Sequence, residues 1–115
     1  MVRGICLGLP EATERPSHGS PSFFAAGRNF VSFLDDHHGD GRLAIWCAAP
    51  EGMQTALVEA APDRFFVPPY VGFRGWVGLR LDRSPDWEEV ADVIRSAYRV
   101  VATRRLREAA GLDTL

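Results

Sequence analysis

Apolar and polar residues alternate in the first half of the chain as they do in strands with one buried face. The clearest segment is 42–48, where Leu43, Ile45 and Cys47 share one parity and should point toward a core. Gly27-Arg28 lies between two further segments of this kind and fits a two-residue hairpin of the Gly-X type. The pattern predicts an antiparallel meander of three strands at 22–26, 29–35 and 42–48.

Helical spacing and short strands follow in the second half. Pro50 opens a helix that Pro62 ends, and 64–67 and 76–82 read as further strands. A short helix is also predicted over 1–9, ended by Pro10.

The strongest helix prediction is the last one. Ser84 should cap it and Pro85 should take its first position, while acidic residues favour its positive end. Arg104, Arg105 and Arg107 would lie at its negative end. Its apolar stripe comprises Trp87, Val90, Ile94, Ala97, Tyr98 and Val101.

These elements predict an α+β fold: an antiparallel β-sheet with helices packed on one face and the other face partly open. At 115 residues, with 46% hydrophobic and 24% charged residues, the chain is expected to form a single soluble domain over 1–115. No apolar run approaches the ~20 residues of a membrane span, and the first nine residues are too short for a signal peptide. We therefore expect a cytoplasmic protein without a membrane partner.

Charge limits the choice of partner. All 13 basic residues are arginine, against 15 acidic residues, for a formal net charge of −2. Arginine can grip phosphate or stack on aromatic rings. A DNA-binding domain usually has a basic excess, so DNA binding here would require a local patch.

Two tryptophans and two arginines are predicted on the open sheet face. Trp46 and Arg42 share parity in one strand, and Trp76 and Arg80 share it in another. If the strands are neighbours, these residues form a ladder that could stack flat ligands or bases and contact phosphate. The alternative is that arginine stems only shield the indole rings from water.

Loops supply further candidates. Arg28 at a hairpin tip and Arg74 in a loop could contact DNA phosphates, or serve only solubility. His18 and Phe24 could face the same cavity as Trp76 and bind a small ligand, although a turn histidine more often satisfies backbone groups.

Catalytic, metal and cofactor sites are not predicted. His37 and His38 are adjacent and should point to opposite sides of an extended chain, which disfavours joint metal binding unless the loop curls. Cys6 and Cys47 lack a Cys-x-x-Cys partner and should be buried and reduced in the cytoplasm. No catalytic triad or phosphate-binding glycine loop is present, so a non-enzymatic protein is expected.

Six short motifs follow one another along nearly the whole chain: Leu-Pro-Glu at 9–11, Pro-Ser-His-Gly at 16–19, Phe-Ala-Ala-Gly-Arg-Asn-Phe at 24–30, Arg-Phe-Phe-Val-Pro-Pro-Tyr at 64–70, Gly-Trp at 75–76 and Ser-Ala-Tyr at 96–98. The ordered set resembles the MmcQ/YjbR family of small bacterial proteins. The resemblance implies a two-layer sandwich similar to the frataxin-like (CyaY-like) fold. It also implies DNA binding of the "double-wing" type, which is itself an inference from fold.

Three functional hypotheses follow. The first is a DNA-binding module that contacts phosphates through Arg28, Arg42, Arg74 and Arg80. The second is a small-molecule binder for a flat aromatic metabolite or antibiotic, using His18, Phe24, Trp46 and Trp76. The third is a protein-interaction adaptor that uses the same open face.

Overall fold

The computed structural model describes residues 1–112, which fold around one six-stranded antiparallel sheet. Its strand order is β1-β2-β3-β4-β6-β5, with every neighbouring pair antiparallel. The three strands of the predicted meander, β2, β3 and β4, are neighbours inside this sheet. The prediction of an α+β fold is confirmed. The strands are β1 (Thr13–Ser17), β2 (Ser20–Ala25), β3 (Arg28–Asp35), β4 (Leu43–Cys47), β5 (Phe65–Phe66) and β6 (Val77–Arg80).

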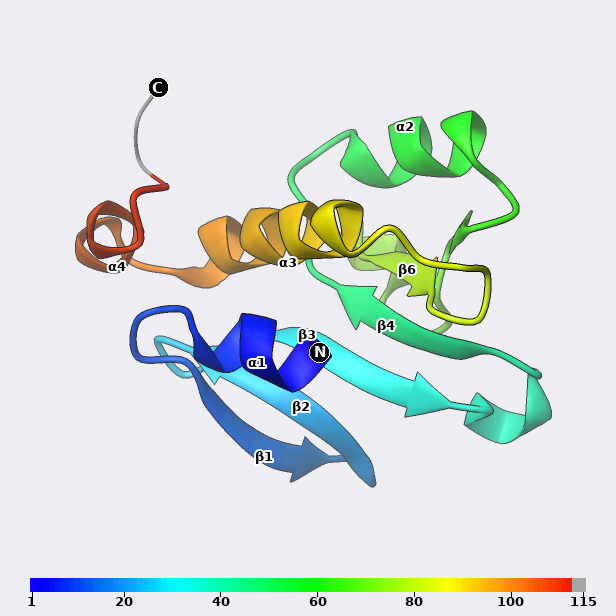
Figure 1. The fold of residues 1–115 in the computed structure, drawn as a ribbon, viewed down its shortest axis with the longest axis horizontal. Coiled ribbons are helices and arrows are strands. Elements are labelled where there is room, and N and C mark those ends of the chain that lie inside the picture. The colour runs from blue at the N-terminus through cyan, green and yellow to red at the C-terminus, as the bar shows by residue number, and fades with distance from the viewer. Residues whose placement is uncertain (113–115) are drawn as a thin grey trace.

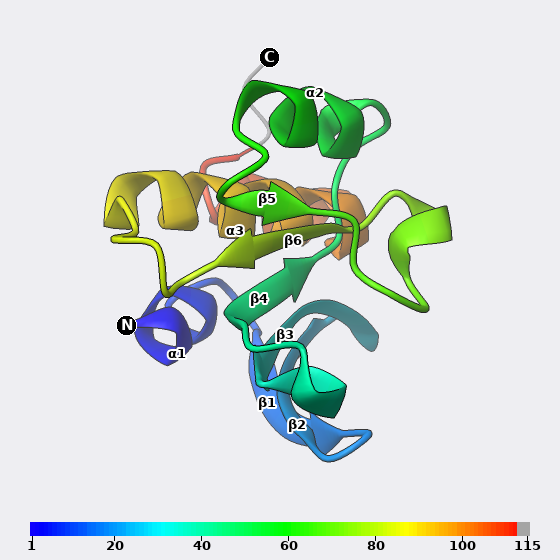
Figure 2. The ribbon, with the colours of Figure 1, turned by 90° about the vertical axis from the view of Figure 1, so that its right-hand side faces the viewer.

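Two of the four helices cover one face of this sheet. Helices α1 (Val2–Leu7) and α3 (Trp87–Val101) lie on the same side (Figures 1 and 2). Helix α2 (Met53–Ala60) packs instead at the edge formed by β5 and β6, and α4 (Arg104–Ala109) follows α3. On the side opposite α1 and α3, the chain carries the short 3-10 turn η2 (Gly72–Arg74).

The core lies between α3 and the inner face of the sheet. Ile45 pairs across the strands with Leu79, and both are buried. Every residue of the predicted α3 stripe is buried except Trp87, which is half-buried. The Tyr98 hydroxyl donates a hydrogen bond of 2.7 Å to the Pro10 carbonyl, which ties α3 to the turn after α1.

A β-bulge breaks the alternation expected in β3. The register shifts between Phe23 and Phe24 of β2, so Phe30 and Val31 of β3 are both fully buried although they are neighbours. Such bulges place an extra residue in one strand and re-aim its side chain. Asn29 holds the bulge: its amide donates to the Phe23 and Val31 carbonyls at 2.9 and 3.0 Å.

The hairpin turn between β2 and β3 differs from the prediction by one residue. Its central residues are Ala26 and Gly27, both with positive φ (52° and 74°), which is the pattern of a type I′ turn. The two-residue Gly-X assignment was therefore wrong, and Arg28 is the first residue of β3.

The last predicted helix is in fact two helices. Asp86 caps α3 by accepting a hydrogen bond from the Glu88 N–H at 3.0 Å, so the predicted Ser84 cap is wrong. The helix ends at Val101, and Thr103 caps α4. The predicted arginines at 104, 105 and 107 therefore belong to α4 and do not lie at the end of α3.

Both cysteines are free and buried, as predicted. Burial is the main cause that raises the pKa of Cys6 to about 12, and it raises the pKa of Cys47 well above its ordinary value. Neither thiol is therefore an activated nucleophile at neutral pH.

Candidate ligand-binding site on the outer face of the sheet

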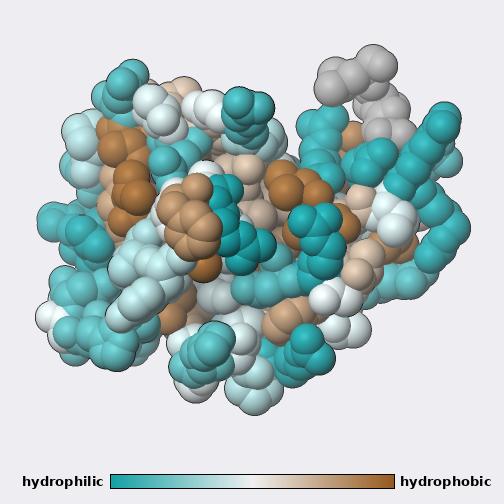
Figure 3. Space-filling view, turned by 180° about the vertical axis from the view of Figure 1, so that it is seen from behind, coloured by the Kyte–Doolittle hydropathy of each residue, from teal (hydrophilic) through white to brown (hydrophobic). Residues whose placement is uncertain are grey.

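The outer face of the sheet, opposite α1 and α3, carries the predicted tryptophans. Residues that pair directly across antiparallel strands point to the same side, so the register defines one row over five strands. Figure 3 shows this side of the molecule, where apolar patches are separated by hydrophilic side chains. The row consists of Ser22, Ser32, Trp46, Gly78 and Phe66.

The two indole rings are on this face, as parity predicts, but they are not open to solvent. Trp46 is 6% exposed and Trp76 is 5% exposed. The 3-10 turn η1 (His37–Gly39) contributes to the cover of Trp46, because the His37 ring contacts that indole with centroids 4.8 Å apart. The expectation of an exposed aromatic platform was therefore wrong.

His37, His38 and Tyr70 extend this aromatic cluster. The rings of His37 and His38 are 4.1 Å apart, and the His37 ring is 6.0 Å from that of Tyr70. The loop does curl here, at Asp36 and His38, whose φ angles are 53° and 50°, so the two histidines do not point to opposite sides as in an extended chain. Both imidazole rings therefore lie close to Tyr70, and the His37 ring also contacts Trp46.

These side chains surround a cavity of about 720 Å³, which we call the aromatic cavity. Its size lies within the range of small-molecule sites. The structure brings together three of the four residues predicted to bind a ligand. The aromatic and imidazole side chains on its wall are those of His18, His37, His38, Trp46, Tyr70 and Trp76.

Phe24, the fourth predicted residue, does not line the aromatic cavity. The guanidinium carbon of Arg15 lies 4.1 Å from the centroid of its ring. His18 reaches the cavity from the β1–β2 turn, where His18 and Gly19 both have positive φ, 50° and 80°.

Trp46 also has a polar atom without a partner. Its indole nitrogen Nε1 is buried and has no hydrogen-bond partner within residues 1–112. A buried donor without an acceptor costs roughly 1–3 kcal/mol. Such groups are rare in folded proteins.

A second cavity of about 400 Å³, which we call the arginine cavity, adjoins the first. Arg28 comes from the start of β3 and Arg74 from the end of η2, so two of the predicted phosphate-binding residues meet there. The Arg74 guanidinium lies 5.7 Å from the centroid of a Trp76 ring. Neither arginine forms an ion pair with a carboxylate of the described chain, residues 1–112.

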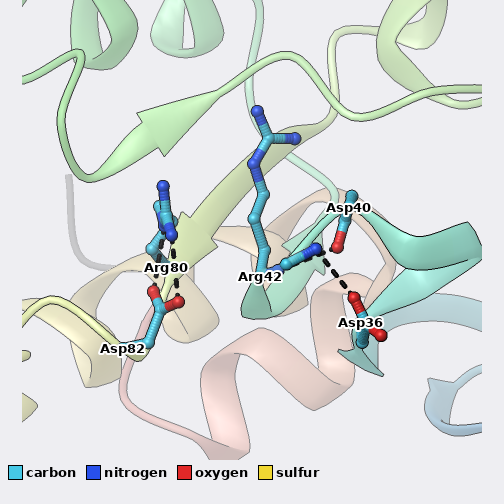
Figure 4. A network of polar contacts seen from close by, with 6 residues as sticks. Asp36, Asp40, Arg42, Arg80 and Asp82 are labelled. Carbon is cyan, nitrogen blue, oxygen red and sulfur yellow. Dashed lines mark hydrogen bonds and ion pairs between the residues drawn. The ribbon is translucent and has the colours of Figure 1, made fainter.

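The other two predicted arginines are engaged elsewhere, and the tryptophan–arginine ladder does not form. Arg42 stacks on Phe66, 4.0 Å from its ring centroid. Arg80 makes a two-pronged ion pair with Asp82 at 2.9 and 3.0 Å (Figure 4). Hydrogen bonding from Arg80 is the main cause that lowers the pKa of Asp82 to about 2.

Acidic side chains also lie beside Arg42. Figure 4 shows Asp36 and Asp40 next to the backbone of Arg42, while the Arg42 guanidinium points away from both. Asp40 accepts a hydrogen bond from the Arg42 N–H at 2.9 Å, and Asp36 accepts one from the Gly41 N–H at 2.8 Å. These bonds shape the β3–β4 loop and place negative charge at this end of the sheet.

The four arginines therefore do not form one surface. Arg42 precedes β4, whereas Ala48, which lines the arginine cavity with Arg28 and Arg74, follows β4. The six residue steps between Arg42 and Ala48 correspond to about 20 Å along an extended strand.

Sequence reasoning missed Tyr70 and the two adjacent histidines as site residues. Tyr70 follows Pro68-Pro69 and has a positive φ of 67°, so strand parity carries no information about its direction. The only signal in the sequence was the clustering of aromatic and turn residues in 64–76.

Two further findings concern the described residues, 1–112. No group of three or more His, Cys, Asp or Glu side chains is arranged to hold a metal ion there. None of the helices in that range is long and apolar enough to cross a membrane.

Comparisons with known proteins support the fold. The model of the YjbR family matches residues 7–100. The crystal structure of Deinococcus radiodurans protein DR2400, which has a DUF419 domain, superposes with a TM-score of 0.74 at 22% sequence identity. That match covers 99% of this chain and 88% of the other, and it shows a shared fold. No curated protein matches the chain.

Proposed function

The chain belongs to the YjbR family, and we propose that this member is a non-enzymatic protein that binds a flat aromatic small molecule. The binding site is the aromatic cavity on the outer face of the sheet. The observation that carries the proposal is that two indole rings, a phenol ring and three imidazole rings from separate segments line one cavity of about 720 Å³.

The chemistry of the wall fits a planar ligand. Aromatic side chains stack on flat rings, and the few polar groups of such a site fix the orientation of the ligand. Ser32 and His18 supply polar groups at this wall.

The tryptophans provide a direct test by NMR. The chain has three tryptophans, and Trp87 does not line the aromatic cavity, so its indole signal is an internal control. Titration with planar aromatic compounds, such as 2-naphthamide, should shift the indole N–H signals of Trp46 and Trp76 and leave that of Trp87 in place. A panel of such compounds that moves none of these signals at millimolar concentration would refute the proposal.

A matched pair of variants sharpens this test. His37→Ala removes a ring that packs on Trp46 at the cavity, and it should weaken binding of 2-naphthamide. Phe24→Leu changes an aromatic residue outside the cavity, and it should leave binding unchanged. Equal loss in both variants would argue that the compound binds elsewhere.

DNA binding is the second candidate function. Its support is the resemblance to DNA-binding "double-wing" proteins, together with three arginines (Arg28, Arg42 and Arg74) that form no ion pair with a carboxylate within residues 1–112. Against it stand the net charge of −2 and the pairing of Arg80 with Asp82. Arg80 would contribute to a phosphate contact only after separation from this carboxylate.

Salt dependence tests this second candidate. Binding of a fluorescent duplex should weaken steeply with salt, and Arg28→Gln or Arg74→Gln should each reduce the slope by about 0.9. Arg95→Gln is a matched control, because Arg95 pairs with Asp92 on α3 and should not change the slope. Absence of duplex binding at low salt would eliminate this candidate.

A further inference from the structure

The aromatic cavity and the arginine cavity share a wall. Asn29 and Trp76 line both of them. The two cavities are therefore neighbours that meet at these two residues. Aromatic rings and imidazoles line one of them, and Arg28 and Arg74 line the other.

The shared wall is rigid on the side of Asn29. Both amide hydrogens of Asn29 are used by the backbone carbonyls of Phe23 and Val31, and its Oδ1 accepts a hydrogen bond from Ser32 at 3.2 Å. Asn29 therefore has no free amide hydrogen for a ligand. Specific polar contacts at the junction must come from the arginines.

The charge at this junction is not compensated. Within residues 1–112, six arginines form ion pairs with carboxylates, and Arg28 and Arg74 are among those that form none. Over the same residues, neither cavity is lined by an aspartate or a glutamate, although the chain has 15 acidic residues. An arginine pair without a nearby carboxylate favours an anionic group, which guanidinium binds with paired hydrogen bonds.

We infer that the ligand of this site is a planar aromatic anion. Its ring occupies the aromatic cavity, and its carboxylate or phosphate group is held in the arginine cavity by Arg28 and Arg74. This inference rests on the proposed function and adds a charge requirement to it. Arg74 is positioned for the role by its approach to Trp76, so that the ring and the anion are bound by adjacent groups.

The test compares ligands of one shape that differ in charge. Isothermal titration calorimetry with 2-naphthoate and with neutral 2-naphthamide isolates the contribution of the anionic group, and 2-naphthyl phosphate distinguishes phosphate from carboxylate. The intact protein should bind one or both anions at least about tenfold more tightly than the amide, as expected for a charge-assisted hydrogen bond.

Arg28→Gln and Arg74→Gln should each reduce this preference and leave the affinity for 2-naphthamide unchanged. Arg83→Gln is the matched control for net charge, because Arg83 is exposed and lines neither cavity. Folding of each variant is checked by its NMR spectrum, and either arginine variant suffices if the other does not fold.

The outcomes separate the two proposals. Equal affinities for the anions and the amide, or an anion preference that survives both arginine variants, would refute the charge requirement and leave the aromatic site standing. Absence of binding by all three naphthalene probes would refute the aromatic site as well. A preference that Arg83→Gln lowers equally would show a general effect of net charge and would also refute the inference.

Discussion

Gly78 of β6 is a position where the outer face should be sensitive to a small change. It lies beneath the ring of Phe66, its cross-strand partner, and a Cβ at this position would meet three ring atoms at 2.3 to 2.6 Å. Carbon atoms pack at about 3.5–4.0 Å, so Gly78→Ala requires the ring to retreat by roughly 1 Å or more. The ring has little room, because the Arg42 guanidinium lies 4.0 Å from its centroid on the outer face.

The size of the effect follows from two opposing contributions. Overpacking of this kind lowers the free energy of unfolding by about 1–3 kcal/mol. Replacing glycine in a strand raises it by about 0.5–1 kcal/mol, because the unfolded chain with alanine has less conformational freedom to lose. We therefore expect Gly78→Ala to lower the free energy of unfolding by about 1–2 kcal/mol. Urea denaturation would show this as a lower midpoint with an unchanged slope.

A double-mutant cycle isolates the cause. In a Phe66→Ala background the ring is absent, so Gly78→Ala should be neutral or stabilising by up to about 1 kcal/mol. Gly4→Ala in α1 is the control, because a Cβ there meets nothing within 4 Å and should stabilise the helix. A penalty for Gly78→Ala that persists without the Phe66 ring would refute this reasoning.

Three further predictions concern turns, the core and pH. Ala26→Gly should raise the thermal midpoint slightly, because Ala26 has φ of 52° and a left-handed residue with a Cβ costs about 1–2 kcal/mol; a lower midpoint would contradict this. Tyr98→Phe should lower the free energy of unfolding by about 1–2 kcal/mol in urea, since it leaves the Pro10 carbonyl without its 2.7 Å hydrogen bond; an unchanged midpoint would show that this bond contributes nothing. The folded-state pKa of Asp82 is about 2, below the ordinary 3.8, so its pairing with Arg80 stabilises the fold above about pH 4 and this stabilisation is lost as pH falls toward 2. The side chains are 30% and 21% exposed, so the effect should be under about 1 kcal/mol, and an Asp82→Asn variant with an unaltered stability profile between pH 4 and 2 would argue against it.

Much of the architecture could be predicted from local patterns. Alternation identified β4, and the apolar stripe identified α3, because a strand or helix must turn its apolar side toward the core wherever it lies in the fold. The same parity placed Trp46 and Trp76 on the outer face. The shared face of the two tryptophans could be predicted for the same reason, whereas His18 lies in a turn where parity does not apply.

The sequence alone therefore determined most of the elements, their order and the face on which most strand residues lie, since these depend on periods of two or 3.6 residues. Only the tertiary structure decided what covers that face and which charges meet there. The bulge that turns Phe30 inward, the curl that brings His37 onto Trp46, and the pairing of Arg80 with Asp82 depend on non-periodic backbone angles and on contacts specific to the folded chain. Such contacts are selected by the packing of the whole domain, and no short window of sequence contains the competing interactions that decide among them.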